Sequence, residues 1–167
     1  MSAKSMEQWV KPVVKDPAQA SPDQLIVVVG FDGSASAYRA LDAATQLISG
    51  RPGSIVVVYV AHLSPGAELS PDAVIESLKG FDALQQEFTE AIRRRLEGVE
   101  PRWSLQRRDG AIAHELVAAA DLVGDDRGNN ASVVIVVGSA MHTYHHVVGS
   151  VPVALVRHAK YPIVVVP

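Results

Sequence analysis

The stretch LIVVVGFDGS, residues 25–34, decides the fold of this chain. Its first half, Leu25 to Val29, is an unbroken apolar run rich in valine, which is typical of a strand buried on both faces of a parallel sheet. Glycine, aspartate and serine follow at once, and from Ala35 to Ile48 the apolar residues recur at helical spacing. The stretch therefore predicts a buried strand, a tight polar turn and a helix.

The same alternation continues to the end of the chain. The apolar runs predict strands over residues 25–29, 54–60, 103–107, 132–137 and 163–166, with 103–107 as an edge strand because its apolar and polar residues alternate. The intervening patterns predict helices over residues 35–48, 71–96, 112–123 and 151–158, with Gly80 as a candidate interruption. Alternating strands and helices predict an α/β domain with a doubly wound parallel sheet and helices on both faces.

The composition is that of one globular domain. The chain has 167 residues, of which 48% are hydrophobic and 20% are charged, which suits a single core. The formal net charge of −3 argues against a nucleic-acid partner, because neutralising phosphates requires a basic surface. The absence of cysteine excludes disulfides and thiolate catalysis, and it fits a reducing compartment.

The N-terminal segment differs in character from the rest of the chain. Residues 1–24 are polar, contain several prolines and lack the apolar centre of a secretory signal, and no apolar run is long enough to span a bilayer. We therefore expect a cytoplasmic protein without a membrane partner. Its organisation is predicted as a flexible N-terminal arm over 1–24 and one domain over 25–167.

The first strand-to-helix junction carries side chains suited to binding. The carboxylate of Asp32 can accept a hydrogen bond from a ligand hydroxyl or amine, and Gly33 allows a positive φ or a close backbone approach. Either Ser34 or Ser36 can cap the following helix. A capped turn without any ligand explains the same residues equally well, so this junction alone does not decide the function.

The second junction, residues 138–150, follows the predicted strand 132–137. Its glycine and hydroxyl residues can present N–H groups to an anion, and the amino end of the next helix adds its dipole. Ser150 fits the capping position, and Pro152 is tolerated in the first turn. A doubly wound sheet places both junctions at one edge, where they predict a cleft for the adenosine end and the phosphates of a nucleotide.

Two more specific functions, metal binding and catalysis, have less support in the sequence. His142, His145 and His146 could chelate a cation, but no acidic or sulfur ligand lies beside them in the sequence, so we expect a polar loop or a dimer contact and no metal. The chain has no dinucleotide fingerprint, P-loop or nucleophile elbow, and no catalytic residue is assigned. Weak ATP hydrolysis, with Asp32 and a histidine, is the remaining enzymatic alternative.

With these patterns in view, residues 25–167 resemble a universal stress protein of the UspA-like family. The resemblance begins with Asp32-Gly33-Ser34 and a helix that contains Arg39-Ala40-Leu41. Its strongest part is the closing pattern, which comprises Gly138-Ser139, Gly149-Ser150-Val151, Val156-Arg157-His158-Ala159 and Pro162 before the apolar run Ile163 to Val166.

The resemblance implies an adenine-nucleotide alpha-hydrolase-like sheet of order 3-2-1-4-5 and a role in the stress response. It also implies a homodimer that pairs the last strand, Ile163 to Val166, and a site for ATP or AMP, with Mg²⁺ in the case of ATP. Asp32 would lie near the ribose and adenine, and the backbone around Val60 would recognise the adenine edge. The ligand-binding residues implied are Phe31, Asp32, Gly33, Ser34, Val60, Gly138, Ser139, Met141, His142, Gly149, Ser150 and Val151.

The chain departs from the ATP-binding pattern of that family in one loop. The pattern has glycine, two residues, glycine, nine residues, then glycine and a hydroxyl residue. Here Met141 stands at the second glycine, and the interval to Gly149 is two residues shorter. Two hypotheses therefore stay open: a dimeric module that binds an adenine nucleotide, and an interaction protein of the same fold in which the shortened loop binds none.

Overall fold

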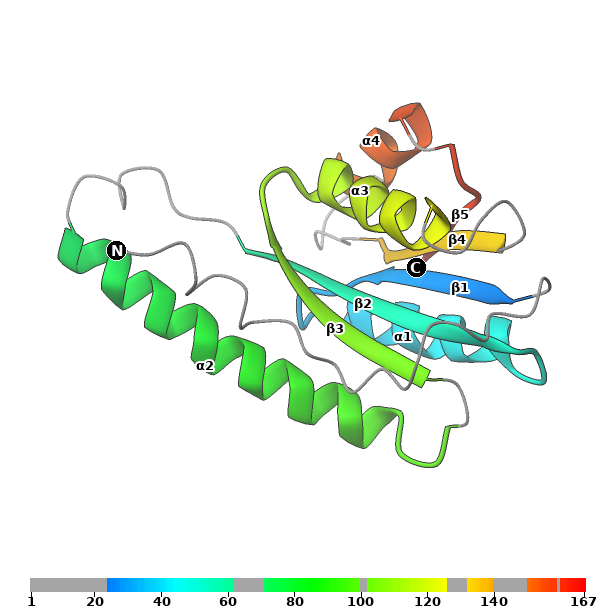
Figure 1. Ribbon diagram of the computed structural model, residues 1–167, viewed down its shortest axis with the longest axis horizontal. Helices are drawn as coiled ribbons and strands as arrows, with labels where there is room; N and C mark the ends of the chain where they lie inside the picture. The colour runs from blue at the N-terminus through cyan, green and yellow to red at the C-terminus, as the bar shows by residue number, and fades with distance from the viewer. Residues whose placement is uncertain (1–23, 62–70, 100–101, 126–131, 140–149, 159) are drawn as a thin grey trace.

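The computed structural model of the chain alternates strands and helices throughout (Figure 1). It describes residues 24–61, 71–99, 102–125, 132–139, 150–158 and 160–167. In chain order the elements are β1 (Leu25–Gly30), α1 (Ala35–Ile48), β2 (Gly53–Ala61), α2 (Pro71–Arg95), β3 (Arg102–Asp109), α3 (Ile112–Asp125), β4 (Ser132–Gly138), α4 (Ser150–His158) and β5 (Ile163–Val166).

These elements form one parallel sheet of order β3-β2-β1-β4-β5, which confirms the predicted topology. Helices α1 and α2 cover one face of the sheet, and α3 and α4 cover the other (Figure 1). Strand order reverses at β1, whose neighbours are β2 and β4. The carboxyl ends of these three central strands are where such a fold binds ligands.

The central strand β1 explains why its sequence is a continuous apolar run. Val27 and Val29 belong to the core under α1 and α2, whereas Ile26 and Val28 belong to the core under α3 and α4. All four side chains are fully buried. Because successive side chains point to opposite faces, a strand covered on both sides has no position left for a polar residue.

Helix α2 corrects one prediction. It runs without interruption from Pro71 to Arg95, so the candidate interruption at Gly80 is wrong. A side chain at Gly80 would meet no atom within 4 Å, and the residue is exposed. Glycine there costs helix propensity, on the order of 1 kcal/mol, but disturbs no packing. Beyond the helix, Gly98 adopts a φ of 76°, the left-handed conformation common just after a helix end.

An aromatic cluster joins α2 to the turn after β1. Phe31 makes edge-to-face contacts with both Tyr38 and Phe88, and Phe88 makes another with Tyr59, each with ring centroids 5.1 Å apart. Gly33 has φ of 78°, and a Cβ there would lie 2.7 Å from the Phe88 ring. The ring of Phe88 therefore supports the turn directly, and the turn needs glycine for both its conformation and its space.

Replacing Phe88 with alanine tests this support. We expect Phe88→Ala to lower the free energy of unfolding by about 3–5 kcal/mol, because the side chain is 6% exposed and contacts two other rings. Glu87→Ala, at the exposed neighbouring position, is the matched control and should change stability by no more than about 0.5 kcal/mol. Urea unfolding of the three proteins measures both; equal losses would contradict the assigned packing.

Candidate functional site

A pocket lies at the carboxyl edge of the sheet, where β1, β2 and β4 end and α1, α3 and α4 begin. Its empty volume is about 620 Å³, counted to its open mouth. The lining residues are Gly30, Phe31, Asp32, Ser34, Ser36, Ala37, Val58, Val60, Ile112, Leu116, Val137, Gly138, Val151 and Pro152.

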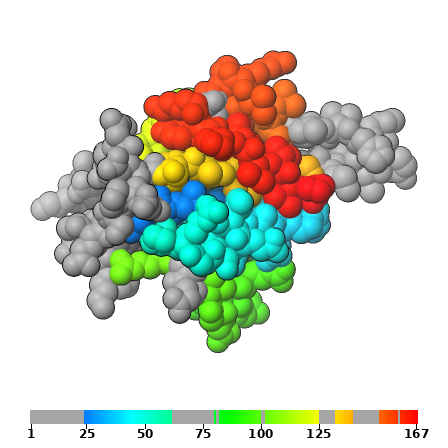
Figure 2. All heavy atoms as spheres, turned by 90° about the vertical axis from the view of Figure 1, so that its right-hand side faces the viewer, coloured from blue at the N-terminus to red at the C-terminus, as the bar shows by residue number. Residues whose placement is uncertain are grey.

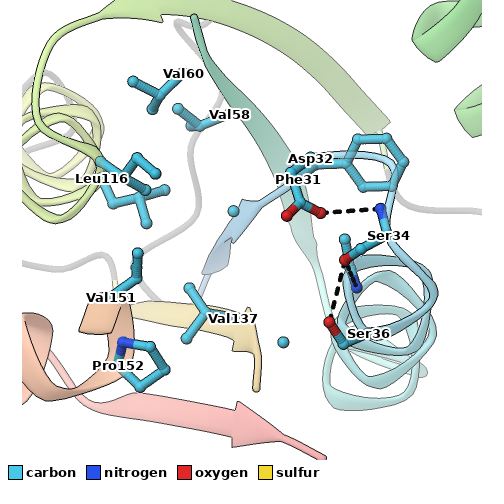
Figure 3. Close-up of a pocket in the computed structure, with 14 residues that line it drawn as sticks. Phe31, Asp32, Ser34, Ser36, Val58, Val60, Leu116, Val137, Val151 and Pro152 are labelled. Carbon is cyan, nitrogen blue, oxygen red and sulfur yellow. Dashed lines mark hydrogen bonds between the residues drawn. The ribbon is translucent and has the colours of Figure 1, made fainter. Parts of the chain in front are cut away.

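The pocket has an apolar side and a polar side. Figure 3 shows Val58, Val60 and Leu116 together on one side, and Ser34 and Ser36 on the other, at the start of α1. The apolar side suits a flat ring, because such a ring gains from contact with aliphatic side chains. The polar side offers hydroxyl groups and the amino end of a helix, which suit a sugar or an anion.

The polar side is organised by the turn that follows β1. One carboxylate oxygen of Asp32 accepts a hydrogen bond from the Ser34 backbone N–H at 2.9 Å. The Ser34 hydroxyl, one of the two predicted caps, caps α1 by accepting from the Ala37 N–H at 3.2 Å and lies 3.1 Å from the Ser36 hydroxyl. Asp32 is exposed and lines the pocket, so its other oxygen is available to a ligand.

The second junction meets the first at Gly138. A Cβ at Gly138 would lie 2.6 Å from the backbone carbon and oxygen of Ser36, so only glycine permits the end of β4 to approach α1 this closely. The next residue, Ser139, is buried and donates its N–H to the Val166 carbonyl at 2.6 Å. Its hydroxyl oxygen has no hydrogen-bond partner among the described residues.

The pocket brings together half of the predicted ligand-binding residues. They are Phe31, Asp32, Ser34, Val60, Gly138 and Val151. Gly33 and Ser139 adjoin lining residues in the chain but do not line the pocket themselves. Phe31 lines the pocket although its ring packs within the aromatic cluster. Met141, His142 and Gly149 lie outside the described residues.

Helix α4 begins at Ser150, one residue earlier than expected, so Ser150 belongs to the first turn instead of preceding it. Pro152 lies in that turn as predicted and lines the pocket. The sequence interpretation missed Ile112 and Leu116 as pocket residues. Their helical spacing identified them only as core positions, and nothing local distinguishes a core residue whose end faces a cavity.

An ion pair lies next to the apolar side of the pocket. The Arg108 Nε donates to a carboxylate oxygen of Glu115 at 2.8 Å, and both side chains are largely buried. The hydrogen bond from Arg108 lowers the pKa of Glu115, and a further hydrogen bond from His114 adds to this effect. Within the described residues, no group of three or more His, Cys, Asp or Glu side chains could hold a metal ion.

The comparisons with known proteins agree with this geometry. The family model described as the universal stress protein family matches residues 25–167. The chain belongs to the universal stress protein family. No curated protein sequence matches it significantly. None of the helices in the described part of this universal stress protein is long and apolar enough to cross a membrane.

Solved structures of universal stress proteins share the fold. One from Lactobacillus plantarum is 21% identical, with a TM-score of 0.70 over 87% of this chain and 99% of that one. A universal stress protein in complex with cAMP is 24% identical, with a TM-score of 0.58 over 86% and 97%. One from Archaeoglobus fulgidus in complex with dAMP is 18% identical, with a TM-score of 0.52 over 87% and 98%.

The lowered pKa of Glu115 predicts how the ion pair depends on pH. A carboxylate whose pKa is lower in the folded state stabilises the fold above its unfolded value of 4.5, and this contribution disappears as the pH falls through the folded value. The stability difference between the wild type and Glu115→Gln should therefore be largest at neutral pH and shrink below about pH 4.5. Urea unfolding at a series of pH values measures it, and a difference that stays constant would contradict the ion pair.

Proposed function

We propose that this universal stress protein is a dimeric stress-response module of the cytoplasm that binds an adenine nucleotide in the pocket at the ends of β1 and β4. The observation that carries the proposal is the division of the pocket into an apolar side and a polar side at the point where strand order reverses. A nucleotide has the same division, with a flat apolar base joined to a hydroxyl-rich sugar and an anionic phosphate.

The backbone of β2 supports binding of the base. Pairing between β1 and β2 ends at Gly30 opposite Val58, and the Phe31 N–H then donates to the Val58 carbonyl at 2.9 Å. Val60, two residues later, directs its N–H and carbonyl to the same side as Val58, because the direction alternates along a strand. Strand β1 has ended there, so this backbone edge is available to the hydrogen-bonding edge of a purine.

The polar side supports binding of the ribose and phosphate. The Asp32 carboxylate can accept a ribose hydroxyl while it keeps its hydrogen bond to the Ser34 N–H. The amino ends of α1 and α4 both border the pocket, through Ser36 and Val151, and their dipoles favour an anion. Two relatives of this fold are described in complexes with cAMP and dAMP, which makes an adenine monophosphate the ligand to try first.

The edge strand β5 supports the homodimer. In the described chain it pairs with β4 alone, and its apolar residues Ile163–Val166 remain only half-buried. Helix α4 covers the same end of the sheet and leaves Val153 and Val156 41% and 70% exposed. Figure 2 shows β5 and α4 side by side on the outer surface. A second copy paired along β5 would satisfy the strand edge and cover these valines.

Nucleotide binding is tested first on the protein as purified. We expect an adenine nucleotide to be released on denaturation, or saturable calorimetric binding of AMP or Mg²⁺-ATP. Asp32→Asn should weaken AMP binding by about ten-fold, because a hydrogen bond to a charged acceptor is lost. Asp42→Asn, on the exposed surface of α1 away from the pocket lining, is the matched control and should leave the affinity unchanged.

If neither nucleotide produces saturable heat at about 1 mM and none is released, the nucleotide half of the proposal is wrong. That result would favour the alternative of an interaction protein that binds no nucleotide.

The dimer is tested by placing a charge on the exposed face of α4. Val156→Glu should convert the dimer into a monomer, since burying an unpaired carboxylate opposes association. Leu47→Glu, on the opposite face in α1, is 38% exposed and serves as the control that should leave the mass unchanged. Sedimentation equilibrium measures both. A wild type that is monomeric throughout, or a Val156→Glu protein that remains dimeric, would contradict this interface.

A further inference from the structure

The ion pair of Arg108 and Glu115 joins two elements that build the apolar side of the pocket. The Arg108 and Glu115 side chains are 21% and 16% exposed, whereas those of the surface pair Arg95 and Asp42 are 51% and 39% exposed. Water screens the pair of Arg108 and Glu115 less, so this pair restricts the backbones of β3 and α3 more than an ordinary surface pair does.

At one end of the ion pair, Arg108 belongs to β3, the strand that pairs with β2. Beyond Val58 the sheet register of β2 involves β3 only, with Val60 opposite Arg108. Strand β3 is itself at the edge of the sheet, and it curves past the end of β1 toward α3 (Figure 1). The position of Val60 therefore depends on an edge strand, and edge strands open more readily than central ones unless something fastens them.

The other end of the ion pair lies in the first turn of α3. Glu115 stands between Ile112 and Leu116, the two residues of this helix that line the pocket. The connection from β3 passes close over the carboxylate, because a Cβ at Gly110 would lie 2.9 Å from its Oε1 atom. Gly110 has φ of 144°, a conformation that other residues rarely adopt, so the connection is shaped to fit the ion pair.

We propose that Arg108 and Glu115 are positioning residues for the base-binding side of the pocket. Their ion pair fastens β3, and through it Val60, to the helix that carries Ile112 and Leu116, and so holds two apolar walls at the spacing required by a flat ring. Neither side chain lines the pocket, so both act through the residues that do. The ligand side of this inference rests on the proposed nucleotide binding.

The test compares Arg108→Gln, Glu115→Gln and the double variant with the wild type, using adenosine, AMP and ribose 5-phosphate as probes. Each single variant should weaken adenosine and AMP by about three- to ten-fold, because the binding-competent spacing is populated less. Ribose 5-phosphate, which has no base, should bind as it does to the wild type. The double variant should lose no more than either single one, because both remove the same interaction.

The control is Arg95→Gln, which breaks an ion pair between α1 and α2 that does not border the pocket. Unchanged adenosine and AMP binding in both single variants, or an equal loss for ribose 5-phosphate, would overturn the positioning role. The second of these results would indicate a general weakening of the fold.

Amide hydrogen exchange of the free protein separates this inference from the proposed function. Exchange at Tyr59 and Ala61, whose N–H groups point toward β3, should become at least several-fold faster in Arg108→Gln and Glu115→Gln than in Arg95→Gln, measured at neutral pH. Unchanged exchange at these amides would overturn the fastening of β2, whether or not a nucleotide binds. A wild type that shows the expected exchange but binds no probe would overturn nucleotide binding and leave the fastening established.

Discussion

The pocket exists because β1 ends at Gly30 while β2 continues to Ala61. A central strand that ends before its neighbour leaves a gap at the carboxyl edge of the sheet, and the chain must turn away sharply to keep that gap open. The turn is held from two directions. On the polar side, Asp32 accepts a hydrogen bond from the Ser34 N–H. On the side of the core, the ring of Phe88 packs against Gly33. Without either contact the turn would be free to fill the gap with its own side chains.

The two cores of the domain contribute differently to this arrangement. The core under α1 and α2 contains the aromatic cluster and supports the turn, so it sets where the polar groups lie. The core under α3 and α4 contains Val58 and Leu116 and continues directly into the apolar side of the pocket. Gly138 joins the two sides, because its lack of a side chain lets the end of β4 lie against Ser36. A change of volume in either core is therefore expected to be felt at the site.

Much of this arrangement could be predicted from the sequence, for identifiable reasons. Val27 and Ile26 lie on opposite faces of the sheet and both are buried. Burial on both faces requires a continuous apolar run, a pattern that is typical of a central parallel strand. Asp32 and Gly33 were predictable because polar and glycine residues directly after a buried strand need an explanation. Leu116 was not, because a leucine on a helix looks the same whether it faces a neighbouring side chain or a cavity. Gly80 misled the prediction, because propensity is local and a long packed helix overrides it.

The two edges of the sheet are built differently, and the difference bears on assembly. Strand β3 carries Arg107 and Arg108, whose ion pairs reach Asp82, Asp109 and Glu115, and charged side chains on an edge discourage pairing with another chain. Strand β5 is four apolar residues and has no charge of its own. The β3 edge is thus charged, in part through the arginine proposed to fasten β2, whereas the β5 edge is apolar. An arrangement in which both edges were open would favour continued association in place of a closed dimer, so a charged β3 edge agrees with the proposed dimer through β5.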